Sequence, residues 1–221
     1  MNLSHYKTLV FDCDGVVLNS NRVKTEAFYN AALAYGETAA QAMVTYHVAN
    51  GGISRYEKFA YFLERLVPVG KKGPNLDELL AHYAALVRQG LARCEIAEGL
   101  YPLRELTAHA NWLIVSGGDQ AELRNIFTTR DLSGLFDGGI FGSPDSKDTI
   151  LAREIALENI QTPALFLGDS KYDYQAANAA GLDFIFISDW SEVNDWGHWC
   201  NQLNIFDRPR IKSLLPDQVD N

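Results

Sequence analysis

The chain has few cysteines, fewer basic than acidic residues, and no long apolar run. Its three cysteines, Cys13, Cys94 and Cys200, are widely spaced and odd in number, so they match neither a disulfide framework nor a zinc pattern. This usage favours a reducing compartment, and we expect a cytoplasmic protein. The first eleven residues lack the apolar segment of a signal peptide, and the apolar runs are too short to span a membrane.

The shortage of positive charge limits the partners. The chain holds 19 basic and 28 acidic residues, a formal net charge of −9. Nucleic-acid binding needs clustered Lys and Arg, so this class of partner is not expected. The same charge repels anionic substrates at long range, so any phosphate site needs its own basic residues. The histidines show no metal-ligand spacing: His5, His47, His82, His109 and His198.

Hydrophobic spacing divides the chain into a helical block set within a strand-helix alternation. The run Leu9-Val10-Phe11 is continuous and apolar, as in a buried strand of a parallel sheet. Four helices are predicted next, at 22–35, 37–49, 54–67 and 76–91. Strands are then predicted at 112–115, 139–141, 164–167 and 184–187, and helices at 119–129, 146–159 and 172–180.

This order predicts an α/β protein with a Rossmann-like, doubly wound parallel sheet. Residues 1–18 and 96–221 would form the α/β core. The helical block at 19–95 is too long for a simple connection, so we expect it to be an inserted α-helical cap domain beside the active edge of the sheet.

Two carboxylates directly follow the first predicted strand. Asp12 and Asp14 flank Cys13, and Gly15 comes next. Alternate residues of an extended segment share a face, so both carboxylates can reach one site while Cys13 points away. Like charges this close are costly unless a cation joins them or one is protonated. A hard cation such as Mg²⁺ suits this setting, and Gly15 allows a sharp turn beside it.

Three further segments place polar residues near predicted strand ends, where open α/β sheets bind ligands. The segment Ser116-Gly117-Gly118 offers a hydroxyl and backbone N–H groups suited to phosphate oxygens. Lys147 supplies a compact positive charge at the start of a helix. Asp169 ends another strand, and Asp173 follows four residues later. Each alone is equally compatible with a plain turn, a solvated lysine or a carboxylate at a helix start.

Taken in this order, the segments resemble the haloacid dehalogenase superfamily of phosphotransfer enzymes. The resemblance runs through residues 11–17, Ser116, Lys147 and residues 168–177, and therefore covers nearly the whole chain. The helical insert resembles the small cap of the phosphoglycolate phosphatase-like and β-phosphoglucomutase-like members. The resemblance implies an α/β catalytic core at 1–18 and 96–221, with a cap at 19–95 that sets substrate specificity.

The resemblance implies a role for each core residue. Asp12 would be the nucleophile that forms an aspartyl-phosphate. Asp14 would protonate the leaving alcohol and then deprotonate the hydrolytic water. Ser116, the Gly117 N–H and Lys147 would hold the phosphoryl oxygens, where charge gathers in the transition state.

The resemblance also implies Mg²⁺ as the cofactor. The metal ligands would be the Asp12 carboxylate, the Asp14 backbone carbonyl and Asp169. Asp173 would act through a water or from behind the direct ligands.

The cap offers candidates for substrate selection. Residues 50–55 resemble the substrate loop of β-phosphoglucomutase-like caps, in which an arginine grips an anionic group. Arg55 is therefore the main candidate, together with Lys24 and Gly52.

These features predict a Mg²⁺-dependent phosphatase acting on a small phosphorylated metabolite, either a sugar phosphate or a phospho-acid. A phosphomutase is the first alternative, but Gly168 stands where the mutases carry an extra acidic metal ligand, and Asn19 and Lys24 where they carry Asp and His. A catalytically silent member that binds a phosphorylated ligand is the second alternative, and the complete set of core residues argues against it. We expect a monomer or homodimer without a membrane or nucleic-acid partner.

Overall fold

The structure is a computed structural model that describes residues 3–216, so residues 1–2 and 217–221 of the predicted core lie outside the described part. Its centre is a parallel sheet in the order β3-β2-β1-β4-β5-β6. The strands are β1 (Thr8–Phe11), β2 (Asn111–Asp119), β3 (Gly139–Ser143), β4 (Ala164–Gly168), β5 (Asp183–Ile187) and β6 (Phe206–Arg208). The predicted α/β fold is therefore confirmed, with β1 between β2 and β4.

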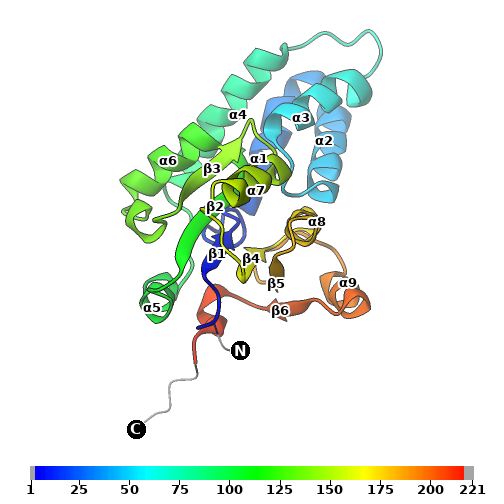
Figure 1. Cartoon of the computed structure of the whole chain (residues 1–221). Coiled ribbons are helices and arrows are strands. Elements are labelled where there is room, and N and C mark those ends of the chain that lie inside the picture. The colour runs from blue at the N-terminus through cyan, green and yellow to red at the C-terminus, as the bar shows by residue number, and fades with distance from the viewer. Residues whose placement is uncertain (1–2, 217–221) are drawn as a thin grey trace.

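Helices cover both faces of the sheet because β1 is apolar on both sides. Leu9 and Phe11 belong to one buried cluster and Val10 to the other. Helices α5 (Leu100–Leu106) and α6 (Gln120–Thr129) contribute to the first cluster, and α7 (Lys147–Ala156) and α8 (Lys171–Ala179) to the second. This three-layer arrangement, visible in Figure 1, points the carboxyl ends of the strands to one edge.

Four helices occupy the segment that was predicted to be a cap. They are α1 (Asn21–Ala32), α2 (Glu37–Ala49), α3 (Arg55–Tyr61) and α4 (Leu76–Leu91), and short turns extend α1 as η1 (Leu33–Tyr35) and α3 as η2 (Phe62–Leu66). Asn75 begins α4 with a reciprocal capping box to Glu78. The four helices lie together at the end of the molecule opposite the two termini (Figure 1). The predicted helical segments match them closely.

The sequence prediction missed several elements near the edges of the core. Helix α9 (Trp196–Leu203), α5 and β6 were not predicted, and neither were the short turns η3 (Ser133–Leu135) and η4 (Ile211–Leu214). Helix α9 lies between the left-handed residues Asp195 and Asn204. Asp is a preferred residue at a helix start, but the Asp195 side chain makes no cap hydrogen bond here. Strand β2 also continues past the predicted end at 115, through Ser116 to Asp119.

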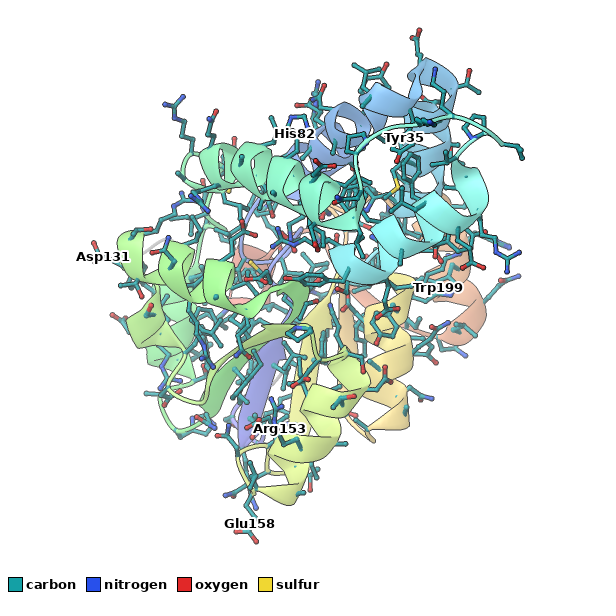
Figure 2. The ribbon with its side chains drawn as sticks, turned by 90° about the horizontal axis from the view of Figure 1, so that it is seen from above. Tyr35, His82, Asp131, Arg153, Glu158 and Trp199 are labelled. Atoms are coloured by element: carbon teal, nitrogen blue, oxygen red, sulfur yellow. The ribbon has the colours of Figure 1, made fainter. Side chains whose placement is uncertain are left out.

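Two segments connect the cap to the core side by side. The Asn19 N–H donates to the Glu95 carbonyl at 2.9 Å, and the Ala97 N–H donates to the Val17 carbonyl at 2.9 Å. Because the two connecting segments are hydrogen-bonded to each other here, we infer that the cap begins and ends close to the predicted residues 19 and 95. In Figure 2, seen from above, Tyr35 and His82 mark the cap, whereas Arg153 and Trp199 mark α7 and α9 of the core.

The cap is closed onto the core. Arg55 of α3 forms a buried ion pair with Glu122 of α6. The next residue, Tyr56, donates its hydroxyl to Asp119 at 2.8 Å. The loop carbonyl of Gly52 lies so near Gly117 that a Cβ there would approach it to 2.1 Å. These contacts join the cap loop directly to the end of β2.

None of the helices in residues 3–216 is both long enough and apolar enough to cross a membrane.

The Gly52–Gly117 approach predicts a substitution that loosens the cap while sparing the core. Gly117→Ala should increase hydrogen exchange across residues 50–58, because the new methyl group collides with the Gly52 carbonyl. The cap loop can move aside, so we expect Tm to fall by no more than about 2–4 °C, equivalent to about 1 kcal/mol. Hydrogen exchange read by mass spectrometry measures the first effect, and thermal unfolding the second.

Gly134→Ala is the matched control, because nothing lies within 4 Å of its added Cβ. It should leave exchange in residues 50–58 unchanged. Unchanged exchange in Gly117→Ala as well would show that the close contact does not hold the cap in place.

Candidate active site

The strand ends and the cap enclose one pocket. Asp12 after β1, Gly117 on β2 and Asp169 after β4 line it from the core. Lys24 of α1 and Lys58 of α3 line it from the cap. The cavity has a volume of about 60 Å³, which leaves room for a compact group in the closed form.

Asp12 is held at the centre of the pocket wall. Its Oδ1 accepts from the Cys13 N–H at 2.7 Å and lies 3.0 Å from the Lys147 Nζ. Burial raises the pKa of Asp12 to about 7, although the positive charge of Lys147 opposes the shift. The neighbouring carboxylates of Asp173 and Asp14 raise the pKa further. Asp12 is thus held in a fixed orientation. The negative charge around it is larger than the single positive charge of Lys147 can compensate.

Asp169 and Asp173 complete a buried acidic cluster with Asp12. One carboxylate oxygen of each lies within 4.8 Å of the others. Burial raises the pKa of Asp169 well above its usual value, and the charges of Asp12 and Asp173 add to this shift. Asn21 at the start of α1 donates to Asp169 at 2.6 Å. Gly15 is required opposite Asp169, because its φ is +74° and a Cβ would lie 2.1 Å from Asp169 Oδ2.

Asp173 is largely occupied by partners within the protein. Its Oδ2 accepts from the N–H groups of Asp169 and Ser170, at 3.2 and 3.0 Å, and from the Ser170 hydroxyl at 2.7 Å. Its Oδ1 accepts from Lys147. Asp173 therefore fixes both the turn after β4 and the lysine beside Asp12.

The acidic cluster fits a small divalent cation. Its donors are carboxylate oxygens, the ligands that Mg²⁺ prefers. The carboxylates of Asp12 and Asp169 are buried and close together, and the pKa of each is raised. The negative charge here therefore exceeds the positive charge that surrounds it. With Asp173 held by its internal bonds, Asp12 and Asp169 are the side chains best placed to be direct ligands.

Asp14 does not join this cluster, and its carboxylate turns toward the cap. It accepts from the Ser20 hydroxyl at 2.5 Å and forms an ion pair with Lys24. Burial alone would raise the pKa of Asp14, but Lys24 and Ser20 hold it below its usual value. Asp14 is therefore ionised here, which suits a proton acceptor.

The Ser116-Gly117-Gly118 segment reaches the pocket through its two glycines. Ser116 is buried, and its Oγ accepts from the Gly118 N–H at 3.1 Å, so the hydroxyl proton remains available to a phosphoryl oxygen. The Ser143 hydroxyl donates to the Gly117 carbonyl at 2.7 Å and holds the segment in place. Gly117 and Gly118 both line the pocket.

The three predicted cap residues line the same pocket, but the two basic ones already have acidic partners. Arg55 is paired with Glu122 and lies over the ring of Tyr83, 5.1 Å from its centroid. Lys24 is paired with Asp14, and Gly52 packs its carbonyl against Gly117. In this geometry Arg55 closes the cap, which differs from the expected grip on an anionic group.

Sequence reasoning missed four residues that matter at this site. They are Asn21, His47, Lys58 and Glu122. Lys58 could have been noticed, because it follows Arg55 by three residues and so shares a helix face with it. His47 is a lone histidine at the end of α2, and only the fold brings it to Lys58.

Comparison with known proteins agrees with this site. A family model of haloacid dehalogenase-like hydrolases matches residues 6–181. A search of curated proteins finds no match.

Solved structures show the same fold at low sequence identity. A haloacid dehalogenase-like hydrolase of Bacteroides fragilis is 19% identical, with a TM-score of 0.70 over 95% of this chain and 100% of its own. A protein of Lactobacillus plantarum named as a phosphoglycolate phosphatase is 24% identical, with a TM-score of 0.66 over 87% and 91%. One of Thermotoga maritima named as a β-phosphoglucomutase is 19% identical, with a TM-score of 0.64 over 95% and 96%.

The family match spans both the strand ends that carry the acidic cluster and the helical insert that covers it. This chain therefore belongs to the haloacid dehalogenase-like hydrolases.

Proposed function

We propose that this protein is a Mg²⁺-dependent phosphatase that hydrolyses a small phosphorylated metabolite through an aspartyl-phosphate on Asp12. One observation supports this most strongly. The Asp12 carboxylate lies within 3.0 Å of the Lys147 ammonium, in a buried acidic cluster under a closed cap. A nucleophile, a fixed cation and a water-excluding lid are the parts that phosphoryl transfer needs.

The first chemical step forms the covalent intermediate. A carboxylate oxygen of Asp12 attacks phosphorus, and the bond from phosphorus to the leaving alcohol breaks. Asp14, after taking up a proton, donates it to the leaving oxygen. Lys147, the Gly117 N–H and the Ser116 hydroxyl bind the other phosphoryl oxygens and stabilise the charge that develops on them.

The second step restores Asp12. Water attacks phosphorus, Asp14 accepts its proton, and the bond from phosphorus to Asp12 breaks. Asp14 is the carboxylate at this point, because it gave its proton to the leaving oxygen in the first step. Asp12 and Asp169 would hold Mg²⁺, which supplies charge neutralisation for the phosphoryl group.

Hydrolysis is favoured over mutase chemistry by the space around Gly168. A Cβ at this position would lie 2.4 Å from the Asp173 Cβ. The extra acidic ligand that the mutases carry here would therefore displace Asp173, and with it the partner of Lys147.

The nucleophile assignment predicts that Asp12→Asn abolishes turnover. An amide of similar size cannot form the acyl-phosphate, so kcat for p-nitrophenyl phosphate should fall by at least about 10³-fold. Phosphate release in Mg²⁺ buffer measures this, and circular dichroism checks the fold. Substantial turnover by the folded variant would reject the covalent mechanism.

The cluster assignment predicts a measurable metal requirement. Chelation should silence phosphate release and Mg²⁺ should restore it, because the buried charge of Asp12 and Asp169 then has its counter-ion. Asp169→Asn should raise the Mg²⁺ concentration for half-maximal activity by about 10- to 100-fold. Added Mg²⁺ should also raise Tm of the native protein but not of Asp169→Asn. Full activity in excess chelator would exclude this metal role.

The Arg55–Glu122 pair predicts a loss of activity that does not depend on the substrate. Arg55→Ala should reduce kcat/KM about equally for ethyl phosphate and 2-phosphoglycolate, by about 10-fold, because closure of the cap serves both. Glu122→Gln should act in the same way. Glu98→Gln, which breaks the exposed pair with Lys212, is the control and should have no effect. A loss confined to 2-phosphoglycolate would instead make Arg55 a direct ligand of the anionic group.

A further inference from the structure

Asn21 is a polar side chain at the site to which the proposed chemistry assigns no role. It is the first residue of α1, so it belongs to the cap, yet it lines the pocket together with the core residue Asp169. Its Nδ2 lies 2.6 Å from the Asp169 Oδ2 and 2.8 Å from the Trp190 carbonyl oxygen. An amide NH₂ carries two protons and both neighbours accept, so each N–H of Asn21 has one partner. Asn21 therefore bridges a carboxylate of the acidic cluster and the main chain of the core.

This bridge fixes how the Asp169 carboxylate is presented. The Trp190 carbonyl holds the amide of Asn21 in one orientation, which leaves a single N–H directed at Asp169. Gly15 makes room for the bond, because a Cβ there would lie 2.5 Å from the Asn21 Nδ2. The other carboxylate oxygen, Asp169 Oδ1, accepts no hydrogen bond within residues 3–216. The bridge thus occupies one oxygen of Asp169 and leaves the other available to a cation.

The loop that follows β5, residues 188–195, holds both ends of the bridge. The Ser191 hydroxyl donates to the Asp169 carbonyl at 2.6 Å. One turn further along α1, the Thr25 hydroxyl donates to the Glu192 carboxylate at 2.9 Å. The residue before Ser191 supplies the carbonyl of the bridge itself. Three consecutive loop residues therefore join the start of α1 to the turn that carries Asp169.

We infer that Asn21 is a positioning residue for the metal-binding carboxylate: it sets the orientation of Asp169, and the loop after β5 sets that of Asn21. This deepens the proposed function and rests on it, because the ligand is the divalent cation proposed there. A carboxylate whose orientation is fixed before the ion arrives loses less freedom on binding it. Because Asn21 lies on α1, the affinity of the core for the cation depends on how the first helix of the cap is attached.

The test measures metal binding without turnover. Mn²⁺, which takes the same oxygen ligands as Mg²⁺, is titrated into the protein, and the free ion is read by electron paramagnetic resonance. Asn21→Leu keeps the size of the side chain but removes both donors, so it should raise Kd for Mn²⁺ by about 10- to 100-fold. Ser191→Ala should raise Kd by a smaller factor. An unchanged Kd in Asn21→Leu would overturn the assignment, and an unchanged Kd in Ser191→Ala would overturn the role of the loop.

Asn30→Leu is the matched control. Asn30 lies on the same helix and its Nδ2 also donates, but to the Glu26 carbonyl at 2.9 Å. It is exposed and does not line the pocket, so its replacement should leave Kd for Mn²⁺ unchanged. Equal weakening in both variants would trace the loss to α1 as a whole and overturn the specific role of Asn21.

Hydrogen exchange separates positioning from a structural role. If Asn21 raises the affinity for the cation, binding of the cation must stabilise the attachment of α1 by the same factor. Mg²⁺ should therefore slow exchange in residues 19–28 of the native protein but not of Asn21→Leu. A lower Tm in chelator together with a native Kd for Mn²⁺ would assign Asn21 to the fold alone and overturn the proposal. Asn21→Ala gives a second variant without the donors if Asn21→Leu does not fold.

The same measurements distinguish failure of this assignment from failure of the proposed function. A native protein that binds Mn²⁺ more tightly than Asn21→Leu but releases no phosphate from any ester would reject the phosphatase and retain the positioning of Asp169. A native protein that binds no Mn²⁺ would overturn this assignment together with the metal role.

Discussion

The buried contact of Lys147 with Asp12 and Asp173 is the interaction on which the site depends. The lysine is fully buried between the two carboxylates, which raise its pKa against the effect of burial. Asp173 can hold this lysine because the backbone turn after β4 and Ser170 fix its other oxygen. A capping box at the start of α8 thus determines where the positive charge beside Asp12 lies. The hydrogen bonds that begin this helix are therefore part of the same network that fixes the geometry around Asp12.

Charge balance also explains why the cap closes where it does. Arg55 and Glu122 are both nearly buried at the cap–core boundary, so opening the cap exposes each charge but also separates the pair. The Gly52 carbonyl can approach Gly117 this closely only because Gly117 has no side chain. Helix α3 brings both Arg55 and Lys58 to the pocket, and Arg55 also reaches across to α6.

Much of the core could be predicted from the sequence because its signals are local. The apolar run of β1 followed by Asp12 and Asp14, and the strand before Asp169, place their residues by strand direction alone. The partners of Asp14 and Arg55 could not be predicted, because Lys24 and Glu122 reach them only through the docking of the cap. Helix α9 was also not predicted, although Asp195, a residue type common at helix starts, precedes it.

Arg55 and Lys58 are both buried, but only Arg55 has a carboxylate partner that it would give up on binding an anion. A cation that already has a buried carboxylate partner must give up that pair to bind an anion, so the gain from the new contact is offset by the loss of the old one. A buried cation without such a partner carries an uncompensated desolvation cost, which an incoming anion relieves. By this argument Arg55, to which the sequence motif directs attention, would have to give up its pair with Glu122 before it could bind an anionic group.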